Sequence, residues 1–334
     1  MQTDEIVTGT HSLGDDIPLY RRFPALRALP RVSLCTPPSP VHEIEGIPDA
    51  TQLWVKRDDF NAPVLGGNKV RGLEFLLGEV RPGDTVLTLG GAGSTHVLCT
   101  AIHARRIGAE TMAMRWRHDM NSMADTISDK LARELTETRV GATPIGAIVR
   151  CGYVRLTRNV HFIPVGGTSP LGALGHVNAG LELAAQLKQG DLPTPANIVL
   201  PVGTGGTMAG IALGLAIAGL DIPVVGARVG PRIFVNLPKV RRTARDVARL
   251  ISGITGETVP MPNNMHITHR VYGGAYGRPL AAGTAAADLL ERVSGIKLDA
   301  TYSAKAFVAA LDLARMKKGP TLFWLTFDAR CLTD

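Results

Sequence analysis

Short apolar runs that alternate with helix-like segments are the feature that most constrains the fold of this chain. Residues 85–89 and 197–202 are almost continuously apolar, and each run ends in glycines that lead into a segment rich in small residues. Such runs are typical of strands buried on both faces of a sheet. Strands that alternate with helices predict a parallel sheet with crossover helices. We therefore expect an α/β protein.

The alternation falls into two series, which are separated near Gly166. The first includes an expected helix at 70–80, a strand at 110–115 and a helix from about 121 to 135, and the second includes a strand at 223–229. Two series of this kind predict two α/β domains with a cleft between them. At 334 residues the chain is long enough for two cores of moderate size.

Composition narrows the function classes. The net charge is +7, but the densest basic cluster, at 239–245, has helical spacing and valine neighbours, which is typical of a solvated helix face. The 16 aromatic residues do not interleave with these cations, so we predict no nucleic-acid partner. An anionic small-molecule substrate accounts for the positive balance equally well. No apolar run reaches the length of about 18 residues typical of a membrane span, so we expect no membrane association.

The cysteines and the first residues bear on the compartment. The four cysteines are scattered, without a C-x-x-C pair or neighbouring histidines, so they predict neither a disulfide framework nor a metal site. The first 20 residues are acidic and polar, unlike a signal peptide. We therefore expect a cytoplasmic protein. The cysteines are Cys35, Cys99, Cys151 and Cys331.

Lys69 follows Gly66-Gly67-Asn68 and directly precedes helix-like residues, so we expect it in the first turn of a helix. The helix dipole disfavours a cation at this end. The position suits an amine whose charge is depressed, and a neutral lysine amine is the nucleophile that forms Schiff bases. Taken alone, the motif is more often a solvated surface lysine after a glycine turn. The segments downstream favour the reactive lysine.

Gly203-Thr204-Gly205-Gly206-Thr207 follows an apolar strand and opens a helix. In this context backbone N–H groups and the helix N-terminus hold phosphate. No Lys-Ser/Thr pair follows, as a P-loop requires, and the spacing is not G-x-G-x-x-G. The loop fits a phosphomonoester, and tight helix packing is the alternative explanation of its glycines.

Two further segments carry polar groups at expected loop ends. In residues 90–96, Ser94 and Thr95 present hydroxyls and N–H groups that suit a carboxylate, although an ordinary helix cap by Ser94 also explains them. Tyr276 lies among glycines, where a buried structural role is uncommon. Tyr302 precedes an expected helix, and packing or function explains it equally well.

Together, these segments resemble pyridoxal-phosphate enzymes of the tryptophan-synthase-β fold type (fold type II), and within them the D-cysteine desulfhydrase and 1-aminocyclopropane-1-carboxylate deaminase group. The resemblance implies two domains, each with a twisted, mainly parallel sheet flanked by helices, and an active site in the interdomain cleft. It also implies a large cofactor-binding domain (1–53 and 167–334), a small α/β domain (54–166) and a homodimer. The matching segments are Thr36-Pro37, residues 56–59, residues 66–74, Gly90-Gly91, residues 203–207 and residues 302–306.

The resemblance implies roles for matching residues. Lys69 matches the lysine that binds pyridoxal 5'-phosphate and moves the substrate's Cα proton, and Asn68 flanks it. Residues 203–207 match the loop that holds the cofactor phosphate. Ser94, Thr95 and His96 match the Ser-Asn-His that holds the substrate carboxylate and the cofactor's ring hydroxyl. Further cofactor and active-site matches are Tyr276 and Tyr302, two active-site tyrosines, and Thr326 and Ser303, expected near the pyridine nitrogen.

Three departures from the group's pattern bear on the substrate. Thr95 replaces an asparagine, and Ser303 follows Tyr302 where the deaminases have a glutamate, which counts against opening of a cyclopropane ring. Residues 325–328 read Leu-Thr-Phe-Asp in place of His-Thr-Gly-Gly, so Phe327 and Asp328 are expected to narrow the pocket.

The sequence therefore predicts a lyase or deaminase that acts on a small amino acid by β-elimination, with desulfhydration of D-cysteine as the named reaction. Aminocyclopropane-carboxylate deamination, elimination from another β-substituted amino acid and racemisation are the alternatives. From a different class, a cofactor-binding carrier or regulator without lyase turnover remains an alternative.

Overall fold

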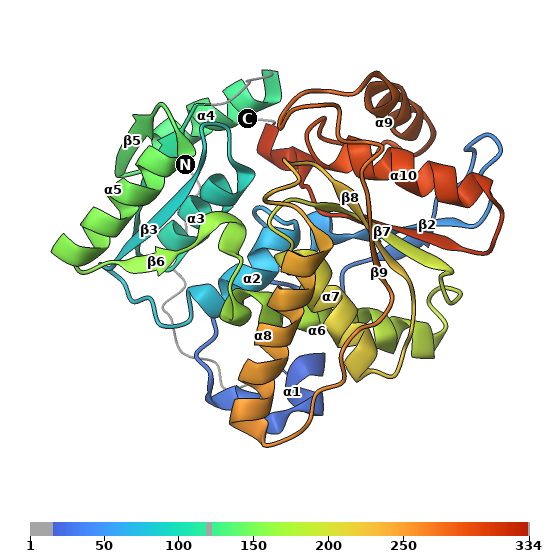
Figure 1. Ribbon diagram of the computed structural model, residues 1–334, viewed down its shortest axis with the longest axis horizontal. Coiled ribbons are helices and arrows are strands. Elements are labelled where there is room, and N and C mark those ends of the chain that lie inside the picture. Colours follow the sequence, from blue (N-terminus) through green and yellow to red (C-terminus); the bar gives the residue numbers. More distant parts are fainter. Residues whose placement is uncertain (1–15, 118–121, 333–334) are drawn as a thin grey trace.

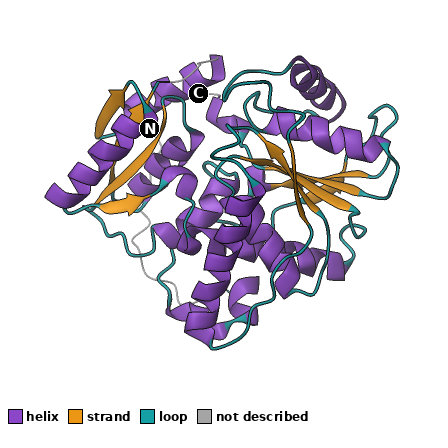
Figure 2. Ribbon diagram, in the orientation of Figure 1, coloured by secondary structure: helices purple, strands orange, loops and turns teal. Residues whose placement is uncertain are grey.

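The computed structural model of the chain describes residues 16–117 and 122–332. These residues form a six-stranded sheet of order β1-β2-β10-β7-β8-β9 and a four-stranded sheet of order β5-β4-β3-β6. All neighbouring strands are parallel except the antiparallel pair β1 and β2. Helices flank both sheets (Figure 1, Figure 2), so the predicted α/β fold with two mainly parallel sheets is confirmed.

The bounds of the elements follow the chain. The strands are β1 (Val41–Glu43), β2 (Leu53–Arg57), β3 (Thr85–Gly91), β4 (Glu110–Trp116), β5 (Glu137–Gly141), β6 (His161–Ile163), β7 (Asn197–Val202), β8 (Val224–Arg228), β9 (Met265–Thr268) and β10 (Thr321–Leu325). The α-helices are α1 (Pro18–Arg22), α2 (Asn68–Leu76), α3 (Thr95–Arg106), α4 (Ser122–Glu134), α5 (Pro144–Thr157), α6 (Pro170–Gln189), α7 (Gly206–Ile217), α8 (Leu237–Thr255), α9 (Ala281–Ser294) and α10 (Ser303–Arg315). Four short 3-10 helices complete the set: η1 (Pro24–Ala28), η2 (Asp58–Phe60), η3 (Val165–Gly167) and η4 (Ala329–Leu332).

The larger sheet is buried on both faces, which explains its continuous apolar strands. Successive side chains of a strand point to opposite faces. Ile198 and Leu200 of β7 accordingly pack with α7 and α8, whereas Val199 packs with α9 and α10. The smaller sheet is sandwiched in the same way, by α3 and α4 on one face and α5 on the other. Its strand β3 and the larger sheet's β7 therefore each end beside the start of a helix.

The predicted elements agree with the structure at most positions, with α2 as one difference. The helix expected at 70–80 begins at Asn68 and ends at Leu76, because residues 77–79 form a turn. The predicted boundary between residues 53 and 54 also falls inside β2, whose residues all pair with β10. The whole of β2 therefore belongs to the larger sheet, and the rest of the predicted domain division stays a prediction.

Glycines bring three helices into backbone contact below the larger sheet. A Cβ atom at Gly175 of α6 would lie 1.8 Å from the carbonyl oxygen of Arg71 on α2. A Cβ atom at Gly214 of α7 would lie 2.3 Å from the carbonyl oxygen of Val177 on α6. Only residues without a side chain permit this approach. Both α2 and α7 thereby pack against α6 at backbone distance.

Within the described ranges, none of the helices combines the length and apolarity needed to cross a membrane.

Candidate functional site

Lys69 is the second residue of α2, as the sequence predicts. Gly67, the residue before the helix, has a φ of 99°, and a Cβ there would lie 2.7 Å from the carbonyl oxygen of Thr326. The Asn68 N–H donates to the same carbonyl at 3.1 Å. A turn that passes this close to β10 requires glycine. Gly66-Gly67 is thus the local reason why Lys69 opens a helix beside the end of β10.

The Lys69 amine has no hydrogen-bond or ion-pair partner among residues 16–117 and 122–332. Burial lowers the pKa of Lys69 from 10.5 to about 8. Its place at the positive end of the α2 dipole acts in the same direction. A substantial share of the amine is therefore neutral near pH 8, which is the form that attacks a carbonyl carbon.

A buried ionic network anchors α2 below Lys69. Arg71 donates to Asp58 Oδ1 at 2.6 Å and to Glu182 Oε2 at 3.0 Å, and Lys56 Nζ donates to Glu182 Oε1 at 2.6 Å. Trp324 Nε1 of β10 also donates to Asp58, at 2.8 Å. These charged side chains are at most 3% exposed. Two cations and two anions balance one another, so the network fixes α2 to β2, β10 and α6 without a net buried charge.

The loop of residues 203–207 connects β7 to α7, as expected for a phosphate loop. Gly205 has a φ of 95°, and α7 begins without a side-chain cap, so its first N–H groups point to the loop. Asn68 Nδ2 donates to Thr207 Oγ1 at 2.7 Å. This hydrogen bond joins the start of the Lys69 helix directly to the loop. A Cβ at Gly203 would lie 3.6 Å from the Tyr302 ring, which places that tyrosine at the same loop.

The turn before α3 places its three predicted residues differently. Ser94 caps α3 by accepting from the Val97 N–H at 3.4 Å, so the ordinary cap is present and a binding role for Ser94 stays a prediction. Thr95 lines a cavity together with Lys69. His96 is 4% exposed, and its Nε2 lies 3.1 Å from Thr88 Oγ1 of β3. Burial, reinforced by Lys69, lowers the pKa of His96 to about 3, so the ring is neutral.

Tyr276 and Tyr302 are brought together, although 26 residues separate them. Their hydroxyls are hydrogen-bonded to each other, and their rings meet edge to face with centroids 6.0 Å apart. Asp299 orders the turn before α10 by accepting from the N–H groups of Tyr302 at 2.6 Å and Ser303 at 2.9 Å. Burial raises the pKa of both tyrosines, so both hydroxyls are protonated at neutral pH.

Thr326 and the two residues after it line the cavity that contains Lys69. The cavity has a volume of about 30 Å³. Asp328 is held there by the Gly66 N–H at 2.7 Å and by an ion pair with Arg330 at 2.6 Å. The residues expected to narrow the pocket, Phe327 and Asp328, are thus part of its wall.

Cys99 and Cys331 also line this cavity and were not predicted as site residues. Burial raises the pKa of the Cys331 thiol to about 12 and that of the Cys99 thiol further. A signal for Cys99 existed, because it follows Thr95 by four positions and so shares its helix face. Cys331 lies beyond the last strand, where no periodic pattern marks it. Of the remaining predicted residues, Ser303 is fully buried, and neither it nor Ser94 or His96 lines this cavity.

The groups present suit pyridoxal 5'-phosphate. Lys69 offers an amine that has no counter-ion within the described ranges, and α7 begins within residues 203–207 without a side-chain cap on its first N–H groups. The fold and this pair of segments on one α/β scaffold are those expected of a cofactor-dependent enzyme. A family model described as "Pyridoxal-phosphate dependent enzyme" matches residues 32–326. The chain belongs to this family and, within its fold type II, to the D-cysteine desulfhydrase and 1-aminocyclopropane-1-carboxylate deaminase group.

Three similar proteins illustrate this membership. The nocardicin C-9' epimerase of Nocardia uniformis subsp. tsuyamanensis is 37% identical over 321 residues, which cover 91% of this chain and 94% of that protein. The D-cysteine desulfhydrase of Salmonella paratyphi B is 30% identical over 325 residues, which cover 92% of this chain and 96% of that protein. The crystal structure of an ACC deaminase homologue matches with a TM-score of 0.77 and 27% identity, covering 93% and 94%.

Proposed function

We propose that this enzyme removes the Cα proton of a small amino acid and then eliminates its β-substituent, with D-cysteine as the substrate. D-cysteine and water would give pyruvate, ammonia and hydrogen sulfide. The observation that carries the proposal is Lys69, a partly buried amine that has no ion-pair partner among the described residues and whose pKa is lowered to about 8. The similarity to D-cysteine desulfhydrases over most of the chain supports the choice of substrate.

Bound pyridoxal 5'-phosphate supplies an electron sink for chemistry at the carbon next to an amino group. In the proposal Lys69 holds this group covalently and, once the substrate has displaced its amine, takes the Cα proton. Residues 203–207 bind the phosphate through the N-terminus of α7. Asn68 keeps this loop and the lysine together through its 2.7 Å hydrogen bond to Thr207.

The other predicted residues act on the substrate and the ring. Ser94 and Thr95 hold the substrate carboxylate at the start of α3, where N–H groups favour an anion. Thr326 and Ser303 would offer neutral hydroxyls to the pyridine nitrogen, which would favour elimination over chemistry that needs a fully protonated ring. Ser303 is fully buried, so Thr326 is the better placed of the two. Tyr276 and Tyr302 carry protons at neutral pH, so this pair serves as a proton donor, for example to the departing sulfur.

Epimerisation at Cα is the second candidate. The 37% identical relative is an epimerase, and Lys69 and the tyrosine pair are two proton-carrying groups, as inversion of Cα requires. Both candidates begin with removal of the Cα proton and differ in whether the β-substituent leaves. Ring opening of a cyclopropane is less well supported, because Ser303 takes the place of the deaminase glutamate.

The test is to incubate the cofactor-loaded enzyme with D- and L-cysteine and with D- and L-serine in deuterium oxide. Release of pyruvate and sulfide from D-cysteine supports the proposal. Interconversion of enantiomers with deuterium at Cα and no keto acid would support the epimerase instead. A protein that binds the cofactor but does neither would be the carrier or regulator of the alternative class. Lys69→Ala, which should abolish the visible absorbance of the bound cofactor, tests the linkage common to all three.

We further infer a cytoplasmic homodimer from the resemblance to this group. Analytical ultracentrifugation of the cofactor-loaded protein tests the assembly, for which a monomer of 35.5 kDa would be the contrary result.

A further inference from the structure

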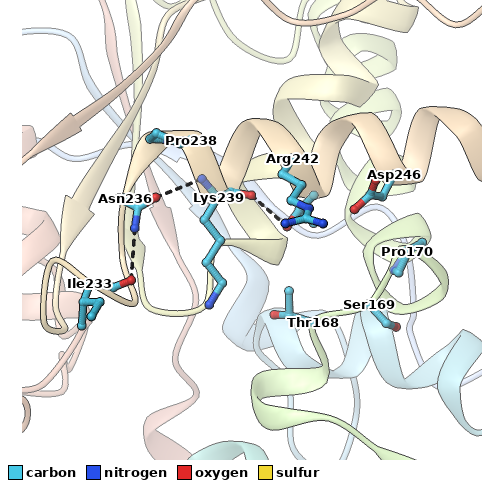
Figure 3. Close-up of a pocket in the computed structure, with 10 residues that line it drawn as sticks. Thr168, Ser169, Pro170, Ile233, Asn236, Pro238, Lys239, Arg242 and Asp246 are labelled. Carbon is cyan, nitrogen blue, oxygen red and sulfur yellow. Dashed lines mark hydrogen bonds between the residues drawn. The ribbon is translucent and has the colours of Figure 1, made fainter.

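A second cavity, separate from the Lys69 site, lies between the start of α6 and the first turns of α8 (Figure 3). Its volume is about 530 Å³, within the range of about 300 to 1,000 Å³ typical of small-molecule sites. It shares no lining residue with the Lys69 cavity. It is lined by Thr168, Ser169, Pro170, Ile233, Asn236, Pro238, Lys239, Arg242, Thr243 and Asp246.

The cavity favours an anion. Lys239 and Arg242 line it, and neither side chain has an ion-pair partner among the described residues. The acidic lining residue, Asp246, is already paired with Arg249 at 3.1 Å. In Figure 3 the Lys239 side chain extends from α8 into the space between the two helices. Since α6 and α8 both begin here without an acidic residue in the first turn, their dipoles add to this positive potential.

The lining also includes apolar groups. Pro170 and Pro238 lie at the two helix starts, and Ile233 is 78% exposed at the edge. An inorganic ion fills only a small part of a cavity of about 530 Å³. The combination therefore fits a small organic molecule that carries a phosphate or carboxylate group beside an apolar part.

The cavity walls also contact the phosphate loop. Thr168 Oγ1 lies 2.5 Å from Thr204 Oγ1, and a Cβ at Gly205 would lie 2.9 Å from Val240 Cγ2 on α8. In contrast, Thr207 and Gly203 of the same loop meet Asn68 and Tyr302 on the Lys69 side. One short loop therefore separates the two sites. An anion bound at one site lowers the electrostatic attraction for an anion at the other.

We propose that this cavity binds a small organic anion, and that its occupation weakens binding of the cofactor phosphate at residues 203–207. An anion between α6 and α8 neutralises the positive potential of Lys239 and Arg242, which otherwise favours a phosphate on the loop. Coupling between two sites is reciprocal, so the cofactor weakens anion binding by the same factor. The proposal does not depend on which reaction the enzyme catalyses.

Calorimetric titration of the cofactor-loaded enzyme with phenyl phosphate and with benzoate tests the site. The two probes share a ring and distinguish a phosphate from a carboxylate ligand by their relative affinity. We expect saturable binding of at least one probe, and about tenfold or greater loss of its affinity in Lys239→Gln and in Arg242→Gln. Arg241→Gln and Arg245→Gln are matched controls on α8 that do not line the cavity, and should change the affinity less than about twofold.

The absence of saturable binding by both probes would overturn the site, as would an equal loss in the cavity and control variants. The coupling has its own readout, the dissociation constant of pyridoxal 5'-phosphate measured by absorbance. A probe concentration that just saturates the wild type should raise this constant several-fold there, and raise it less in Arg242→Gln, whose site is only partly occupied at the same concentration. A probe that binds without changing cofactor affinity in the wild type would refute the coupling.

Discussion

Replacing Glu182 by glutamine removes one charge from the network that anchors α2. Its carboxylate accepts from Lys56 Nζ at 2.6 Å and from Arg71 Nη1 and Nη2 at 3.0 Å. The amide introduced by Glu182→Gln would keep one acceptor oxygen but turn an NH₂ group towards these donors. One of two buried cations would then lack a counter-ion, since Asp58 alone would remain.

Two arguments give the free energy of unfolding that Glu182→Gln should lose. Although burial opposes ionisation, Arg71 and Lys56 lower the pKa of Glu182 from 4.5 to about 2, which corresponds to about 3 kcal/mol in favour of the charged form. Breaking a buried ion pair by removal of one partner typically costs about 3 to 5 kcal/mol. We therefore expect Glu182→Gln to lower the free energy of unfolding by about 3 kcal/mol at pH 7.

The loss should depend on pH with a definite sign. Because the pKa of Glu182 is depressed in the folded state, its contribution is complete above about pH 4.5 and is lost as the pH falls through about 2. At pH 3 only about 1 kcal/mol should remain, so the difference between wild type and variant should shrink. Glutamine does not titrate, so the change comes from the wild type.

Urea denaturation at pH 7 and pH 3, followed by circular dichroism, measures both quantities. Glu257→Gln is the control, because Glu257 pairs with Arg22 at 2.8 Å in an exposed ion pair worth less than about 1 kcal/mol. The reasoning is refuted by a loss below about 1 kcal/mol in Glu182→Gln at pH 7, or by equal losses at the two pH values.

Three further predictions concern the site and its support. The rate at which pyridoxal 5'-phosphate attaches to Lys69 should rise with pH around a midpoint of about 8, because only the neutral amine reacts. Stopped-flow absorbance measures this rate, and a midpoint near 10.5 would contradict the lowered pKa of Lys69. Tyr302→Phe should lower kcat by about 10²-fold while the bound cofactor keeps its absorbance. Tyr276→Phe should have the same effect, because the two hydroxyls share one hydrogen bond. Unchanged steady-state kinetics in both variants would exclude the pair from proton transfer. Gly175→Ala should destabilise the protein by about 3 kcal/mol or more, since its Cβ would lie 1.8 Å from the α2 backbone. Gly253→Ala on α8, where the added Cβ would meet open space, should instead stabilise the protein by about 0.5–1 kcal/mol. Thermal unfolding compares the two variants, and equal effects would show that the contact between α2 and α6 relaxes freely.

The sequence was sufficient for the parts of the fold and site that local pattern determines. Glycines just before a helix placed Lys69 in the first turn of α2. Glycines between a strand and a helix likewise placed residues 203–207 at the start of α7. The order of these motifs along the chain then carried the resemblance to the family, and the resemblance assigned them to one site.

Contacts between distant residues were not predictable in this way. Glu182 meets Lys56 across 126 positions of sequence, and neither residue differs in pattern from a surface charge. The placement of β2 beside β10 also depends on a pairing across most of the chain, which explains why the predicted domain boundary cuts this strand. Cys331 enters the Lys69 cavity for a similar reason, through a turn after the last strand.

The backbone contacts among α2, α6 and α7 determine which part of the active site is free to adjust. Lys69 and the phosphate loop stand on helices that touch without intervening side chains, so their separation behaves as a fixed span. Thr95, in contrast, belongs to a helix of the smaller sheet. A cofactor held by Lys69 and residues 203–207 would therefore rest on helices whose spacing is fixed. Any movement of Thr95 or of the residues after β10 that widens the Lys69 cavity would leave the distance between Lys69 and residues 203–207 unchanged.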